Sequence, residues 1–489
     1  MASHRSTEDD PGLPIKLQPV SNGEFYQRAP SELALETARR TRVVADDQAR
    51  RLGVSRRNFL LSAAGSATML ATLAACSSDQ AAEHGATPGG TFDVGETTTS
   101  AGNVVPADPD EAAAVVSGDE FVFDVQGHFL QYPEGTDFPL PGFPQDDCGA
   151  TDPHDCYSAK TFFDLMFDQS DPSMLVLSAI PTGGGLLTEQ VMADAVATAE
   201  ERCGKGRVLM QGFANPSTMT PTELREAMAT TAADFPIAAW KSYTHAGGPG
   251  WYLDDHDPNA PQVGHALLEH AVEVGPPIVA VHKGLNSVGG NPANAPYSDP
   301  TDVGPAAGAH PDVNLVIYHS GWDFGPPEGL YESRDTGVDR LITSCRNAGI
   351  GEGKNVYAEL GSTWRFVMTD PEAAAHTLGK LLVQFGEDRL VWGTDSIWYG
   401  SPQDQIEAFR AFQITPEFQE RYGYPALTSE VKAKILGLNS ARLYGVEVPE
   451  GRCRDQAATQ ELRQRAGTRN RTLGPVSRRI IDALARSAH

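Results

Sequence analysis

The sequence predicts an α/β fold and, within that class, a (β/α)8 TIM barrel. Short apolar runs recur along the chain, and stretches with helical patterns separate them. Continuous apolar runs of this length are typical of parallel strands that are covered on both faces. Eight such runs that alternate with helices favour a closed barrel. The runs lie at 121–126, 174–180, 207–213, 236–241, 277–282, 314–319, 355–360 and 389–395.

Two of the stretches between these runs carry clear helix signals. Thr220, Pro221 and Glu223 predict a helix start with a hydroxyl cap and a proline in the first turn. Apolar residues spaced by three and four over 266–275 predict a second helix, which Gly275 ends. The competing fold is an open doubly wound sheet. It lacks support because no GxGxxG motif follows the first run.

The chain is acidic overall, with 489 residues and a formal net charge of −26. Hydrophobic residues make up 40% and charged residues 21%, which is enough for an ordinary globular core. The negative charge repels nucleic acid and anionic lipid. We therefore expect a small-molecule substrate and no nucleic acid, with membrane contact only through the N-terminal region.

Residues 1–76 are expected to be an N-terminal extension that ends in an export signal. Arg56 and Arg57 precede a short Ala-rich apolar stretch, which resembles a twin-arginine signal and is too short for a membrane span. The LAAC sequence at 73–76 resembles a lipobox with Cys76 as the lipidated residue; the alternative is an ordinary signal with an incidental cysteine. The pattern predicts export by the twin-arginine route to the cell surface or periplasm.

Composition divides the rest of the chain into a linker, a barrel and a tail. Residues 77–119 are rich in Ser, Thr, Gly and Ala, which predicts a flexible linker. The barrel is expected over 120–450, and an arginine-rich tail, solvated or in contact with a partner, over 451–489. None of the six cysteines forms a CxxC pair, so a cysteine zinc site is not expected. Cys148 and Cys156 flank a short polar loop and form either a disulfide or two free thiols.

The candidate site follows from the last residues of the predicted strands. In TIM barrels the reactive groups sit at the carboxyl ends of the strands. His128, His282, His319 and Asp395 follow or end four of the runs, so their side chains should converge on one mouth. Imidazole nitrogens and a carboxylate suit Zn²⁺ or, as an alternative, Mn²⁺. Gln126 and His128 are two residues apart, so both should point to the same side of the strand.

The chain from about Phe121 to Val446 resembles the amidohydrolase superfamily, in particular the amidohydrolase-related group that includes aminocarboxymuconate semialdehyde decarboxylase. The resemblance rests on the order of DVQGH (124–128), VHKG (281–284), YHSGW (318–322), WGTDS (392–396) and NSARLYG (439–445). It implies that His128 and His282 bind the metal, that Asp395 binds it and moves a proton, and that His319 acts on the substrate. It also implies a homodimer.

The sequence departs from this family at Gln126, where the group usually has histidine or glutamate. Glutamine is a weaker ligand, so Gln126 either binds the metal or only hydrogen-bonds. Lys241 ends the fourth run, where some relatives carboxylate a lysine to bridge two metals; here we expect it to line the pocket. Lys283, Glu359 and Trp322 also follow or end strands and are expected to contact substrate, with the Lys283 ammonium holding a substrate carboxylate. The two lysines near the mouth favour a small anionic substrate.

Three functions fit these residues. The first is hydrolysis of an amide, ester or lactone, with Asp395 accepting a proton from water and His319 and the metal stabilising the oxyanion. The second is non-oxidative decarboxylation or hydration of a carboxylic acid. The third is a surface lipoprotein that keeps the barrel and binds without catalysis, which Gln126 motivates.

Overall fold

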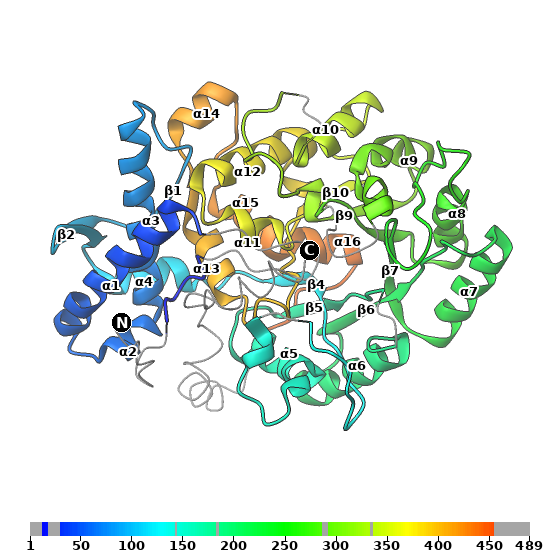
Figure 1. The fold of residues 1–489 in the computed structure, drawn as a ribbon, viewed down its shortest axis with the longest axis horizontal. Helices are drawn as coiled ribbons and strands as arrows, with labels where there is room; N and C mark the ends of the chain where they lie inside the picture. Colours follow the sequence, from blue (N-terminus) through cyan, green and yellow to red (C-terminus); the bar gives the residue numbers. More distant parts are fainter. Residues whose placement is uncertain are drawn as a thin grey trace.

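The computed structural model describes residues 12–17, 30–141, 144–181, 185–285, 292–332 and 336–453. Eight parallel strands form one sheet, in which each strand is hydrogen-bonded to the next along the chain (Figure 1). The strands are β4 (Phe123–Gly127), β5 (Met174–Leu177), β6 (Val208–Phe213), β7 (Ile237–Tyr243), β8 (Ile278–His282), β9 (Asn314–Tyr318), β10 (Val356–Glu359) and β11 (Leu390–Val391). Each lies within one of the eight predicted runs or overlaps its end.

The sheet closes on itself between its first and last strands. Gly127 forms a parallel bridge with Ser396. The backbone N–H of Val125 donates to the carbonyl of Trp392, and that of Asp395 donates to the carbonyl of Gln126, both at 3.0 Å. These bonds pair the edge strands that an open sheet would leave unpaired. The predicted (β/α)8 barrel is therefore confirmed.

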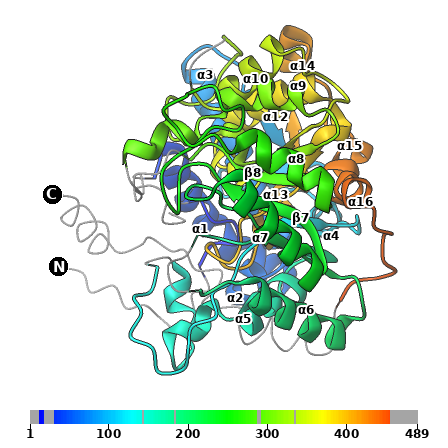
Figure 2. The same ribbon diagram turned by 90° about the vertical axis from the view of Figure 1, so that its right-hand side faces the viewer.

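Helices cover the outside of the barrel, as the two views in Figures 1 and 2 show. Thr220 and Glu223 form a reciprocal capping box at the start of α7, and Gly275 follows the last residue of α8, as predicted. The helices after β4 are α5 (Ala159–Phe163), α6 (Glu189–Cys203), α7 (Pro221–Asp234), α8 (Gly264–Val274), α9 (Val303–Ala309), α10 (Val338–Asn347), α11 (Thr363–Val367), α12 (Pro371–Phe385), α13 (Gln403–Ala411), α14 (Pro416–Tyr422), α15 (Ser429–Ala433) and α16 (Asn439–Tyr444).

The N-terminal region forms its own elements, which lie at one flank of the barrel (Figure 1). They are α1 (Glu32–Leu52), α2 (Arg56–Leu60), α3 (Ala63–Glu83), β1 (Gly90–Phe92), β2 (Thr97–Ser100), β3 (Asn103–Pro106) and α4 (Pro109–Ser117). None of the helices in the described part of the chain is long and apolar enough to cross a membrane. Cys76 lies inside α3 with only 4% of its surface exposed, so its thiol is covered in this fold.

The prediction of a flexible linker over 77–119 is wrong. β1 pairs in antiparallel register with β12 (Phe412–Ile414), so its backbone groups have partners in the barrel domain. The few apolar residues of the segment are placed where they are buried: Phe92, Val105 and Val116 are 4%, 0% and 0% exposed. Composition averages over the segment and misses these contacts. The arginine-rich tail from 454 onward lies outside the described residues.

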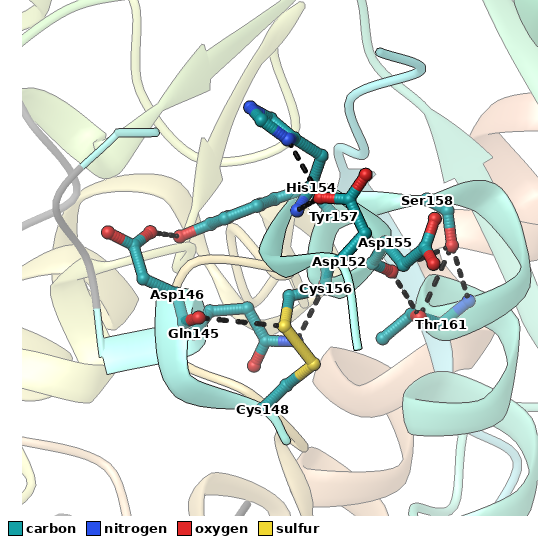
Figure 3. Close-up of a disulfide and its surroundings, with 10 residues drawn as sticks. All are labelled: Gln145, Asp146, Cys148, Asp152, His154, Asp155, Cys156, Tyr157, Ser158 and Thr161. Carbon is teal, nitrogen blue, oxygen red and sulfur yellow. Dashed lines mark hydrogen bonds and ion pairs between the residues drawn. A yellow bond between two sulfur atoms is a disulfide. The ribbon is translucent and has the colours of Figure 1, made fainter. Parts of the chain in front are cut away.

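Two disulfides join cysteines in the described residues. Cys148 and Cys156 are bonded, with a Cα–Cα distance of 5.5 Å, which decides between the two predicted states (Figure 3). Around this bond, Gln145 Nε2 donates to the carbonyl of Cys156 at 2.8 Å, and the Tyr157 hydroxyl donates to Asp146 at 2.6 Å. The second bond joins Cys203 at the end of α6 to Cys453, 250 residues later.

Candidate functional site

Side chains from four strands meet at the carboxyl ends of the barrel strands. His128 Nε2 lies 3.2 Å from Asp395 Oδ1, so the first and last strands are in contact here. His282 Nδ1 lies 3.2 Å from His319 Nε2. Gln126 Nε2 donates to Asp395 Oδ1 at 3.1 Å and lies 3.5 Å from His319 Nε2, so it joins the two pairs. All five side chains are buried. The structure thus brings together every residue that the sequence proposed as a metal ligand.

Backbone carbonyl groups set the tautomers of His128 and His319. His128 Nδ1 lies 2.6 Å from the carbonyl oxygen of Ser178, and His319 Nδ1 lies 2.8 Å from that of Gly361. A carbonyl oxygen only accepts, so Nδ1 carries the hydrogen in both rings. In the neutral ring Nε2 then presents a lone pair, and both Nε2 atoms lie in the cluster. Histidines that bind metals are commonly held in this way.

The contact between His128 and Asp395 needs a positive charge. The lone pair on His128 Nε2 and the carboxylate of Asp395 repel each other unless a proton or a cation lies between them. Two ligands of a tetrahedral zinc ion at about 2.1 Å are about 3.4 Å apart, close to the separations found here. The Oε1 atom of Gln126 is buried without a hydrogen-bond partner and could serve as one more ligand atom for a metal ion. The donor set therefore fits a divalent ion.

In this structure the candidate ligand side chains contact each other in pairs, His128 with Asp395 and His282 with His319. Over the described ranges, no three His, Cys, Asp or Glu side chains surround a common point closely enough to hold an ion. Binding of an ion would replace the His128–Asp395 and His282–His319 contacts.

The protonation states also suit metal binding. Burial lowers the pKa of His282 well below its usual range and that of His319 to about 4, so both rings are neutral at pH 7. Burial of Asp395 opposes its ionisation, but its hydrogen bond with His128 and the charge that His319 carries below its own pKa of about 4 outweigh burial and lower the pKa of Asp395 to about 2. Metal ligands must be neutral imidazoles and ionised carboxylates.

Several residues at the site have left-handed backbone conformations that side chains other than glycine rarely adopt. The φ angles are 67° at His319, 52° at Ser320, 57° at Ser362 and 57° at Asp395. Each such residue is energetically unfavourable by about 1–3 kcal/mol and persists only where its surroundings hold it. Such residues cluster at functional sites. Their presence at the ends of β9, β10 and β11 supports a functional role for this end of the barrel.

Two buried carboxyl groups hold the strand ends in place. Glu359 accepts hydrogen bonds from the backbone N–H groups of His319 at 3.0 Å and Gly361 at 2.5 Å. Asp124 accepts from the backbone N–H groups of Gln126 at 3.0 Å and Thr394 at 3.1 Å. Burial raises the pKa of Asp124 to about 7 and that of Glu359 well above its usual range. Glu359 therefore positions His319, and the prediction that it contacts substrate is not supported.

The two predicted pocket lysines do not present free ammonium groups to a substrate. Lys283 donates to Asp302 at 2.7 Å and to the carbonyl of Tyr297 at 2.8 Å, and neither member of the ion pair is exposed. The prediction that Lys283 binds a substrate carboxylate is therefore wrong, because the chain itself supplies the counter-charge. Lys241 is buried in the barrel, with its ammonium 3.8 Å from the ring centre of Tyr318 and 4.3 Å from that of Tyr243.

Trp322 lies at the edge of a pocket beside the site and not in the cluster of ligands. Its ring stacks on Phe366 at 5.2 Å. A cavity of about 220 Å³ is bounded by this pair, by Phe324 and by Leu17 from the N-terminal segment. The expected contact of Trp322 with substrate therefore stays a prediction.

Sequence reasoning missed three residues of the site. His245 follows β7, and its ring lies 4.6 Å from that of His282, with Nδ1 buried and unpartnered. Burial and the charge of Lys283 lower the pKa of His245 to about 3. Ser362 donates to Asp395 Oδ2 at 2.5 Å and is 2.7 Å from the hydroxyl of Tyr399. Of these three, His245 carried a usable sequence signal, because it is a histidine four residues beyond the predicted run 236–241.

The fold and the site define a TIM-barrel protein whose reactive side chains gather at the carboxyl ends of the strands, as they do in barrel enzymes generally. The sequence model described as amidohydrolase matches residues 179–446, which is more than half of the chain. The chain therefore belongs to the amidohydrolase family, whose members generally depend on a divalent metal. The decarboxylase-like subgroup and the homodimer stay predictions. No curated protein matches the chain significantly.

Solved structures with a similar fold are distant. A 2,6-dihydroxybenzoate decarboxylase from Rhizobium is 15% identical, with a TM-score of 0.42 over 67% of this chain and 99% of that one. A 5-carboxyvanillate decarboxylase from Sphingomonas paucimobilis is 14% identical, with a TM-score of 0.40 over 67% and 100%. An amidohydrolase from Burkholderia multivorans with bound zinc is 16% identical, with a TM-score of 0.37 over 67% and 100%. At this distance they support no conclusion about the reaction.

Substitution of single site residues should distinguish those that bind the metal from those that only lie next to it. We expect the purified protein to bind zinc or manganese, and His128→Ala or Asp395→Asn to weaken that binding by more than about 100-fold. Gln126→Ala should weaken it by only about tenfold, because a neutral amide is a weak ligand and Gln126 also orients Asp395. The measurement is metal content after dialysis and titration calorimetry. His376→Ala, a buried histidine on α12 that bonds to Tyr424, is the matched control. Full metal binding by His128→Ala would contradict the assignment.

Substitution of Lys283 should affect stability and not metal binding. Lys283→Met leaves Asp302 buried without its counter-charge and should lower the free energy of unfolding by about 3–5 kcal/mol. Lys160→Met, which removes an exposed ion pair with Asp164, should lower it by about 0.5 kcal/mol or less. Chemical denaturation and metal content give the two readouts. A stable Lys283→Met protein with only a raised KM would restore the substrate role.

Proposed function

We propose that this protein is a metal-dependent hydrolase that cleaves an amide, ester or lactone bond in a small molecule. The observation that carries the proposal is the placement of Asp395. Its Oδ1 atom faces His128, and its Oδ2 atom accepts a hydrogen bond from Ser362. An ionised carboxylate held in this way beside a cation site is suited to accept a proton from water during attack on a carbonyl.

In the proposed hydrolysis, the site residues hold the metal ion, orient its ligands and move a proton. His128, His282 and Asp395 would hold the ion, and Gln126 would orient the carboxylate. When bound, a divalent ion supplies Lewis acidity, which lowers the pKa of water from about 15.7 to near 7. Asp395 then takes up the proton and returns it to the leaving group. Ser362 keeps one oxygen of Asp395 in position through this exchange.

His319 is better suited to accept a proton than to donate one. Its Nδ1 hydrogen is given to the carbonyl of Gly361, so the neutral ring has only a lone pair at Nε2. A lone pair cannot stabilise an oxyanion, so the expected oxyanion role does not fit the neutral ring. We propose instead that His319 binds the ion or serves as a second proton acceptor.

The alternative lyase function loses one of its arguments. A decarboxylase or hydratase of a carboxylic acid needs a cation to hold the substrate carboxylate; a bound divalent ion could supply it, but the two lysines do not. Lys283 is neutralised by Asp302, and Lys241 lies against the rings of Tyr243 and Tyr318. These contacts remove the argument that two lysines favour an anionic substrate. The binding-lipoprotein alternative is also weaker, because the left-handed residues at three strand ends hold an ordered polar cluster.

The two disulfides support a second proposal, that the protein matures in an oxidising compartment outside the cytosol. Disulfides persist in such compartments and are rare in the cytosol. The bonds Cys148–Cys156 and Cys203–Cys453 use four of the six cysteines of the chain. This agrees with the expected export, although it does not identify the route.

The reaction can be tested with a panel of lactones, esters and amides beside aromatic carboxylic acids. We expect turnover of a member of the first group, with one oxygen from H₂¹⁸O in the product. Asp395→Asn should lower kcat by about 100-fold to 10,000-fold because the proton acceptor is lost. His376→Ala should keep full activity. Release of carbon dioxide without ¹⁸O incorporation would decide for the lyase.

The disulfides can be tested by stability. The loop-closure relation gives about 5.5 kcal/mol for a 250-residue loop and about 2.5 kcal/mol for an eight-residue loop. Cys203→Ser should therefore lower the free energy of unfolding roughly twice as much as Cys148→Ser. Denaturation of both variants and peptide mapping without reductant are the measurements. Four free thiols in protein purified from its own cells would refute the oxidising compartment.

A further inference from the structure

The described segment at residues 12–17 lies against the loop that follows the last barrel strand. Ile15 and Leu17 are 1% and 5% exposed and belong to the main hydrophobic core. Lys16 between them is 3% exposed, so its charge is buried as well. A buried lysine requires a counter-charge from its surroundings.

Lys16 holds both ends of the segment from Ser401 to Asp404. Its ammonium donates to the carbonyl oxygen of Ser401 at 2.5 Å and to Asp404 Oδ1 at 3.2 Å. Its backbone N–H donates to Asp404 Oδ2 at 3.0 Å, so both carboxylate oxygens are used. Ser401 ends the loop after Asp395, and Asp404 lies in the first turn of α13. Lys16 therefore joins this loop to the helix that follows it.

The same loop carries two aromatic residues that contact the site. Trp398 stacks on His128, with ring centres 5.9 Å apart. The Tyr399 hydroxyl lies 2.7 Å from Ser362 Oγ, which in turn donates to Asp395. A shift of this loop would move the neighbours of a proposed ligand and of the proposed proton acceptor. Lys16 touches neither reacting group, so its effect would pass through the loop.

The helices that follow residues 12–17 are built into the same core. Met69, Leu70 and Leu73 on α3 are at most 1% exposed and share the core with residues of α13. Each such side chain contributes roughly 1.5–3 kcal/mol when fully buried. α3 and α4 both contact α13, beside which they lie in Figure 1. Cleavage before Cys76, as a lipobox would direct, would remove Lys16 and most of α3.

We propose that residues 12–17 and helices α1–α3 remain part of the working enzyme and that Lys16 is a positioning residue for the loop 396–404. The region that resembles an export leader thus contributes Leu17 to the lining of the cavity and Lys16 to the contacts that hold the loop. The placement of this loop beside the catalytic centre rests on the proposed function. The retention of residues 12–17 and the contacts of Lys16 with the loop do not rest on that function. Both can be tested without a substrate.

Hydrogen–deuterium exchange of the full chain tests whether Lys16 positions the loop 396–404. In the wild type we expect slow exchange at 13–17, 66–73 and 396–404. Lys16→Met should speed exchange at 396–404 by at least about tenfold through local opening, and Lys16→Arg should restore most of the protection. Arg39→Ala is the control, since it removes an exposed ion pair with Glu36 in the same region. Rapid exchange at 13–17 in the wild type, or equal effects of Lys16→Met and Arg39→Ala, would overturn the proposal even if Lys16→Met fails to fold.

The intact mass of the protein purified from its own cells tests retention. We expect a chain that includes Lys16 and an unmodified Cys76 thiol, which reacts with a maleimide only after denaturation because it is buried. A mature chain that begins with a lipidated Cys76 would overturn the proposal. Both results are independent of whether the enzyme is a hydrolase, so failure of that assignment would leave them readable.

Discussion

The closure of the barrel between β4 and β11 is the constraint on which the site depends. Asp124 spans the closure, because its carboxyl group accepts from the backbone N–H groups of Gln126 and Thr394, one on each side. The bond from Asp395 N–H to the carbonyl of Gln126 continues the pairing by one more residue. As a result, residues 269 positions apart in sequence place Gln126 Nε2 and Asp395 Oδ1 at 3.1 Å. The cluster is therefore a consequence of how the sheet ends meet.

A second carboxyl group does the same for the neighbouring strands β9 and β10. Glu359 binds the backbone of His319 and of Gly361, and these bonds hold His319 at a φ of 67°. The space around Glu359 explains why glycine follows in two places. A Cβ atom at Gly361 would lie 2.4 Å from Glu359 Oε1, and one at Gly393 would lie 1.7 Å from it. The glycines of the WGTD motif and after β10 thus make room for the carboxyl group that hydrogen-bonds to the backbone of these strand ends.

These contacts show what the sequence could and could not predict. The eight strands follow from apolar runs, and the convergence of His128, His282, His319 and Asp395 follows from the rule that barrel strands present their last residues to one mouth. The role of Lys283 does not follow, because its partner Asp302 comes from a segment whose path no local pattern fixes. Ser362 was likewise hidden, since a serine after a strand is common and only its left-handed backbone directs it to Asp395.

The N-terminal region shows a deeper limit of sequence patterns. A short helix of alanine, serine, threonine and leucine suits a membrane signal and a protein interface equally well, because both environments exclude water. In α3 the hydroxyl groups of Thr68 and Thr72 donate to carbonyls of Ala64 and Thr68 at 2.8 Å, which satisfies them inside a buried helix. Small side chains also let neighbouring helices approach closely. What separates the two environments is the surface offered by the rest of the chain. Here α4, α13 and β1 provide an apolar surface that α3 covers, and the Lys16–Asp404 pair joins residues 12–17 to α13.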